Sequence, residues 1–123
     1  MTEIFRLRND DQILGYTKKI YSNTFYSKDL YGWSGKPIKG WIQQDINTDL
    51  RDKNNQLIFE EDIILAQYNS GAKIYIHVVY DPELDHFLFF NFKTGDIVYK
   101  GLEVFSENFS REQLHRVSYS FLN

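Results

Sequence analysis

The 123-residue chain contains no cysteine, only two prolines and two alanines, and no long apolar run. Without cysteine the protein has no disulfide, thiolate nucleophile or cysteine-ligated zinc, and the composition fits a reducing cytoplasm. No stretch approaches the ~20 apolar residues of a membrane helix, so we expect no membrane association. The first residues, MTEIFRLRND, lack the apolar core of a signal peptide, so we expect no secretion.

An excess of positive charge is also missing, because the formal net charge is −3 and the isoelectric point is about 5.5. Such a balance disfavours a general affinity for nucleic acid, which relies on clustered lysine and arginine. A chain of this length supports one sizeable core, so we predict a single domain over residues 1–123. β-Branched and aromatic residues dominate the apolar set, and this favours a mainly β fold over a helical one.

The segment Thr48–Leu65, TDLRDKNNQLIFEEDIIL, joins a polar turn to an apolar run. Asp and Asn side chains bind their own backbone two residues on and tolerate positive φ, so a reversal is predicted at 53–56. A strand is predicted at 57–59, and an acidic triplet interrupts it before a second strand at 63–65. Three carboxylates inside an apolar run indicate a bulge or corner whose side chains turn to water.

This segment resembles the signature of the YopX-like proteins of bacteriophages and prophages, which typically reads T-G-L-K-D-K-N-G-x-x-I-Y-E-G-D-I-V. The positions that match in register are Thr48, Leu50, Asp52, Lys53, Asn54, Ile58, Glu60, Asp62 and Ile63. The opening EIFRLRNDDQ and the closing HRVSYSF are also similar to those of family members. Three glycines of the usual pattern are replaced here by Asp49, Asn55 and Glu61. Asn55 tolerates φ > 0 at modest cost, whereas Asp49 and Glu61 predict a local backbone that differs from the typical member.

The resemblance implies an SH3-like β-barrel with its core at about 41–122, extra N-terminal strands and loops, and one short helical turn near the C-terminus. It also implies the cytoplasm of a bacterial host. The molecular function of the family is not established, so the resemblance supplies context and no chemistry.

The rest of the chain supports strands joined by short turns. We predict a hairpin over residues 4–14. The region 16–40 shows no sustained period, so its aromatic residues could lie on strands or on one short helix, and we favour strand or extended structure. Glycines at 32, 35 and 40 indicate a loop that also holds Trp33 and Trp41. The remaining predicted strands span 41–46, 73–80, 86–92, 97–99 and 117–121. Helix is predicted only within 106–115, where Ser110 and Gln113 have the spacing of a capping box.

The histidines and carboxylates give weak signals for chemistry. The histidines are His77, His86 and His115. A hairpin could bring the first two face to face, but we interpret all three as partly buried strand residues without a metal.

Glu60 and Asp62 would lie on one face of a strand and suggest a paired-carboxylate enzyme, although we interpret Glu60–Asp62 as a barrel corner. Asp81, Glu83 and Asp85 copy the first positions of a calcium loop. The glycine and distant glutamate of such a loop are missing, so we predict a solvated hairpin loop.

Aromatic residues make up 17% of the chain, with ten Phe and nine Tyr, and this exceeds the usual need of such a core. One segment combines them with lysine, namely Tyr16, Lys18, Lys19, Tyr21, Phe25, Tyr26, Lys28, Tyr31, Trp33, Lys36 and Lys39. Aromatic side chains are enriched in interface cores, so we predict a non-enzymatic protein that binds a host or phage protein or itself. The residues that we expect at the contact are Tyr31, Trp33, Lys36, Lys39 and Trp41. The alternative is single-stranded nucleic acid bound by the surface of residues 16–41. No cofactor is expected.

Overall fold

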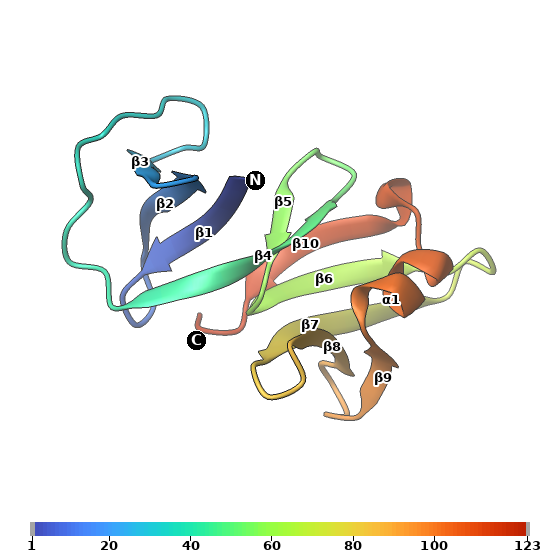
Figure 1. The fold of residues 1–123 in the computed structure, drawn as a ribbon. Coiled ribbons are helices and arrows are strands. Elements are labelled where there is room, and N and C mark those ends of the chain that lie inside the picture. The colour runs from blue at the N-terminus through green and yellow to red at the C-terminus, as the bar shows by residue number, and fades with distance from the viewer. Residues whose placement is uncertain (1, 123) are drawn as a thin grey trace. The chain divides into compact units, whose positions relative to one another are not determined.

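The computed structural model describes residues 2–122 and divides the chain into two compact units, residues 1–47 and 48–123. The fold is mainly β, with antiparallel sheets and one short helix, as predicted (Figure 1). The strands are β1 (Thr2–Arg8), β2 (Ile13–Ile20), β3 (Asn23–Ser27), β4 (Gln43–Arg51), β5 (Leu57–Phe59), β6 (Asp62–Gln67), β7 (Lys73–Asp81), β8 (His86–Asn91), β9 (Ile97–Lys100) and β10 (Leu114–Tyr119). The helical elements are α1 (Leu102–Asn108) and a 3-10 turn, η1 (Arg111–Gln113).

In the first unit the strand order is β3-β2-β1-β4, and all neighbouring strands run antiparallel. The N-terminal hairpin is confirmed, since β1 pairs with β2 and the Asn9 N–H closes the turn by donating to the Gln12 carbonyl. For the region 16–40 we favoured extended structure over a short helix, and β2 and β3 confirm this for its first part, up to Ser27. A long loop then runs from residue 28 to β4, and it is the cyan segment of Figure 1.

A buried ionic cluster joins β1 to β4 within this unit. Arg6 lies opposite Asp45 in the strand register, and its Nε donates to the Asp45 carboxylate at 2.8 Å. The Nε of Arg8 donates to the same carboxylate at 2.9 Å. All three side chains are buried, so removing one partner would leave an uncompensated charge away from water. This cluster fixes the register of the sheet that carries the long loop.

The second unit begins with the predicted turn, which is confirmed at residues 53–56. Asp52 directs it: one carboxylate oxygen accepts from the N–H groups of Asn54 and Gln56, and the other accepts from the N–H of Arg116 on β10. Asn55 holds φ 62°, as its amide side chain allows. One fully buried carboxylate therefore closes the hairpin between β4 and β5 and also attaches the last strand to it.

The acidic triplet forms the predicted corner, because β5 ends at Phe59 and β6 starts at Asp62. Glu61 occupies the bend with φ 73°. The expectation that all three carboxylates face water is wrong for Asp62, which is fully buried and accepts the Phe59 N–H at 2.8 Å. The backbone N–H that the bend frees needs a buried acceptor, and this carboxylate supplies it.

The second unit contains a sheet of order β10-β6-β7-β8-β9. The predicted strands at 73–80, 86–92 and 97–99 are confirmed by β7, β8 and β9, and the turns between strands contain Gly71 and Gly95 at positive φ. β10 is not a neighbour of β9 but returns to pair with β6. The chain thus forms a meander whose last strand lies beside its first long strand.

Helix α1 begins earlier than predicted. The sequence favoured helix within 106–115, and the structure places α1 at Leu102–Asn108, so that only its last three residues fall in that range, followed by the single turn η1. The capping box of η1 is confirmed, since the Ser110 N–H donates to the Gln113 side chain at 2.8 Å. Packing explains α1: the Phe105 ring is fully buried and stacks on Phe89 of β8 at 4.0 Å between ring centroids.

Candidate partner-binding site

The candidate site lies in the first unit, on the loop that follows β3. A polar network starts this loop: Ser27 Oγ accepts from the N–H groups of Asp29 and Leu30, and its hydroxyl contacts the Asp29 carboxylate at 3.1 Å. Asp29 in turn accepts from the N–H groups of Tyr31 and Gly32. These charge-assisted bonds, led by the one from Tyr31, lower the pKa of the Asp29 carboxyl. A short sequence, SKDLYG, thereby builds its own turn.

Two further contacts hold the middle of the loop against the sheet. Ser34 exchanges both backbone hydrogen bonds with Tyr26 of β3, at 2.7 and 3.0 Å. The Trp33 ring lies under the ammonium group of Lys18 on β2, with 4.3 Å from Nζ to the ring centroid. Such a cation–π contact contributes about 0.5–1 kcal/mol at exposed sites. The loop is therefore pinned by an aromatic side chain, as predicted for this segment.

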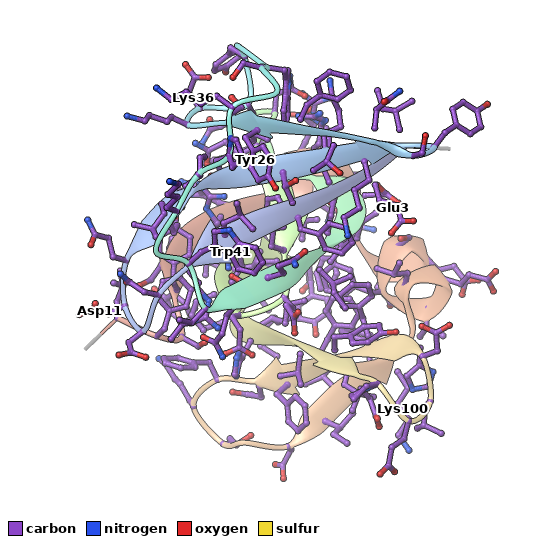
Figure 2. All side chains as sticks on the ribbon, turned by 60° about the vertical axis from the view of Figure 1, so that its left-hand side comes forward. Glu3, Asp11, Tyr26, Lys36, Trp41 and Lys100 are labelled. Atoms are coloured by element: carbon purple, nitrogen blue, oxygen red, sulfur yellow. The ribbon has the colours of Figure 1, made fainter. Side chains whose placement is uncertain are left out.

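A groove of about 840 Å³ opens between β2, β3 and the loop. Its apolar lining comes from Leu14 of β2, the Tyr26 ring, and Pro37 and Ile38 of the loop. Gly15 permits this arrangement, because an added Cβ would lie 2.4 Å from Ile38 Cδ1. Glycine in a strand interior often marks such a close approach. In Figure 2 Lys36 and Tyr26 lie at the loop, whereas Trp41 lies apart from both.

Positive charge surrounds the apolar lining. Lys28, Lys36 and Lys39 are also among the residues that line the groove, and all three are exposed. Asp29 is the one acidic residue among those that line it, and its carboxylate is engaged by the loop backbone. The groove therefore combines an apolar floor with a basic rim. That combination suits a ligand that carries an anionic group beside an apolar side chain.

The predicted contact residues fall into two groups. Lys36 and Lys39 line the groove, and Tyr31 and Trp33 lie on the same loop without lining it. Tyr31 is 91% exposed, so its ring is available to a partner. Trp41 is half-buried near the start of β4 and is not among the groove residues. The contributions of Leu14, Gly15 and Ile38 were missed, although an isolated glycine within an apolar strand was a readable signal.

The interpretation of the three histidines as partly buried strand residues is confirmed, since they are half-buried on β7, β8 and β10. The facing pair that was considered for His77 and His86 does not form. β7 and β8 do pair, but His77 lies opposite Phe90 and His86 lies opposite Asp81. His77 Nε2 instead lies 3.6 Å from a carboxylate oxygen of Glu61. Within residues 2–122, no group of three or more histidine, aspartate or glutamate side chains is arranged to hold a metal ion.

The carboxylate pair considered for chemistry does not share a strand, because Glu60 lies in the bend between β5 and β6, whereas Asp62 begins β6. Asp62 accepts a backbone N–H at this corner, and Glu61 accepts a 2.5 Å hydrogen bond from the Ser120 hydroxyl. In the loop after β7, Asp81 accepts from the Glu83 N–H and so caps the turn. Asp85 accepts from the Tyr80 hydroxyl, and this bond is the main cause of the raised pKa of Tyr80. The loop thus uses two of its three carboxylates to stabilise itself.

No protein-family model, curated protein or solved structure matches this chain. Among the described helices, α1 and η1, neither is long and apolar enough to cross a membrane. The function is therefore inferred from the geometry of the loop and the groove.

Proposed function

We propose that this chain is a small, non-enzymatic phage or prophage protein, related to the YopX-like proteins, that binds a protein partner through its 28–42 loop. The groove beside that loop carries the proposal, because it joins apolar walls to three lysines and lies next to the exposed Tyr31. The partner would be a host or phage protein in the bacterial cytoplasm. It would present a segment with acidic and apolar side chains together.

The backbone of the signature segment supports the proposed kinship. Asp49, Asn55 and Glu61 stand where the usual pattern has glycine, and they adopt φ of 65°, 62° and 73°. A positive φ is what glycine supplies at little cost and other residues adopt rarely. We expected a backbone different from that of typical family members at Asp49 and Glu61, because neither residue is glycine. Both residues nevertheless adopt the positive φ that glycine favours. We infer that the backbone of the family signature is kept here although its glycines are replaced.

An SH3-like barrel with its core at about 41–122, within a single domain, remains our proposal. The return of β10 to β6 supports the barrel, because a closing strand must come back to the start of the meander. The short turn η1 immediately before β10 supports it as well. In the strand order β10 and β9 are the two edge strands of the sheet. A closed barrel would require the sheet to curve until these two edge strands lie side by side.

Peptide binding tests the proposed function. The purified chain would be titrated with extended peptides that carry an apolar residue among either acidic or basic residues, and binding would be followed by tryptophan fluorescence. We expect the acidic peptides to bind, and we expect the double substitution Lys36→Glu and Lys39→Glu to weaken them by about tenfold or more. Lys53→Glu is the matched control, because Lys53 is exposed in the other unit. Equal binding of acidic and basic peptides would contradict the proposal.

Single-stranded nucleic acid is the alternative ligand for the same surface. The stacked pair of Lys18 and Trp33, together with the groove lysines, favours it, since such proteins combine aromatic rings with cationic contacts to phosphate. Labelled oligonucleotides decide between the two ligands. Binding that falls steeply with rising salt would favour the alternative, and absence of binding at low salt would exclude it.

A further inference from the structure

A small pocket with an aromatic wall lies within the second unit. Its volume is about 270 Å³. The apolar part of its lining comes from segments that are far apart in the sequence, namely Leu50 of β4, Phe105 of α1, Phe109 at the C-cap of α1, and Leu114 of β10. The rings of Phe105 and Phe109 lie 5.2 Å apart between centroids, and both residues are buried. Packing in the core therefore fixes the aromatic wall of this pocket.

Two arginines line the same pocket, and both guanidinium groups are attached to the turn at 52–55. Nη1 of Arg51, the last residue of β4, donates to the Asn55 carbonyl at 2.7 Å. Nε of Arg111, the first residue of η1, donates to the Asp52 carbonyl at 3.1 Å. Each of these bonds uses one of the five N–H donors that a guanidinium group carries. The turn thus holds two guanidinium groups beside one pocket and leaves most of their donors available.

The lining of this pocket carries an excess of positive charge. Within residues 2–122, no carboxylate forms an ion pair with Arg51 or Arg111. The one carboxylate in the lining belongs to Asp49, so the two guanidinium groups outnumber it. Guanidinium groups bind carboxylate and phosphate oxygens through parallel N–H donors. Because hydrogen bonds already hold both side chains, an anion would cost little side-chain entropy to bind.

We propose that this pocket binds a small aromatic acid, with its anionic group at Arg51 and Arg111 and its ring against Phe105 and Phe109. The volume lies just below the range of about 300–1,000 Å³ that is typical of sites for drug-sized ligands, so the pocket suits a single ring. The anionic group is a carboxylate or a phosphate monoester, because both present pairs of oxygens that match a guanidinium group. The pocket shares no residue with the groove beside the 28–42 loop, so the proposal is independent of the proposed partner binding.

A nuclear magnetic resonance titration of the full chain tests the site with phenylacetate, phenyl phosphate and the neutral benzyl alcohol. We expect at least one of the two acids to bind with a Kd of about 1 mM or lower and to shift the backbone amide signals of Ser106, Phe109 and Arg111. Benzyl alcohol should bind at least about tenfold more weakly, because it has the ring but lacks the charge. Preference for phenyl phosphate would identify the ligand as a phosphate monoester, and preference for phenylacetate would identify it as a carboxylate. Equal binding of benzyl alcohol and the acids would overturn the proposal, as would the absence of shifts at these amides with about 10 mM of either acid.

Substitutions separate the contribution of charge from that of shape. Arg51→Gln and Arg111→Gln should each weaken binding of the acid by at least about fivefold. Lys73→Gln is the matched control, because Lys73 is an exposed cation of the same unit that does not line the pocket. Ser106→Trp should weaken the acid by at least about tenfold, because Ser106 is exposed and lines the pocket, so that the large side chain would occupy its space. This variant keeps both arginines and their bonds to the turn, so it decides the question if loss of Arg111 unfolds the chain. Binding of the acid that survives both Arg51→Gln and Ser106→Trp would refute the site.

Discussion

Removal of the Asp52 carboxylate should destabilise the second unit far more than removal of an exposed carboxylate. Asp52 is fully buried and accepts three backbone hydrogen bonds, from Asn54 at 2.9 Å, Gln56 at 3.0 Å and Arg116 at 3.0 Å. Asp52→Ala leaves these three N–H groups without their acceptor. Two of them belong to the hairpin turn, and the third belongs to the last strand.

The magnitude follows from the kind of bond that is lost. A hydrogen bond to a charged group contributes about 1.5–3 kcal/mol, whereas the donors of a turn can partly recover by binding water. The Arg116 N–H lies within the β10 strand and recovers least. We therefore expect a loss of about 3–4 kcal/mol for Asp52→Ala, which is a large part of the 5–15 kcal/mol that is typical of a domain. Asp52→Asn should lose less, because the amide oxygen still accepts.

Urea unfolding followed by far-ultraviolet circular dichroism measures this loss, and amide hydrogen exchange locates it. Exchange should accelerate at Asn54, Gln56 and Arg116 in Asp52→Ala. Asp96→Ala is the control, because Asp96 is an exposed aspartate in the turn between β8 and β9 of the same unit, and it should change stability by less than about 0.5 kcal/mol. Equal losses for the two variants, or unchanged exchange at Arg116, would refute the reasoning.

Three further predictions concern the groove and the core. Gly15→Ala should destabilise the first unit by about 1–3 kcal/mol in urea unfolding, because its Cβ would lie 2.7 Å from the Ser27 carbonyl oxygen as well as 2.4 Å from Ile38 Cδ1, at a backbone φ of 153°. Phe105→Ala should cost about 3–5 kcal/mol in the second unit, since it empties the buried site against Phe89. The pKa of Asp29 is lowered in the folded chain, so its contribution is present above the ordinary carboxyl pKa and is lost as the pH falls through the lowered value. An acid titration followed by nuclear magnetic resonance should show its two bound loop amides shifting together with the carboxyl.

Each of these predictions has a matched comparison. Gly35→Ala should be nearly neutral, because nothing lies within 4 Å of its added Cβ. Val104→Ala should cost much less than Phe105→Ala, since Val104 is exposed on the same helix. Loop amides that stay unshifted while Asp29 protonates would show that its carboxylate does not hold the turn.

Part of the candidate site was predictable because lysine and aromatic residues cluster within one short segment. Of the five predicted contact residues, Lys36 and Lys39 line the groove, whereas the three aromatic ones do not. The groove itself was not predictable from the sequence. It depends on the close approach of the Ile38 side chain to Gly15, which lies 23 positions earlier in the chain. The pairing of His77 with Phe90 in place of His86 also depended on the register of the hairpin, which no local pattern specified.

Local chemistry specifies several features of this fold. The turn at Asp52–Gln56, the capping box at Ser110 and the alternation along β7 each arise from residues within a few positions of one another. Two other features depend on contacts between residues that are far apart in the chain. These are the position of α1 and the burial of Asp62. A short helix gains most of its stability from packing, and a buried carboxylate is tolerated only where distant folding supplies its donors.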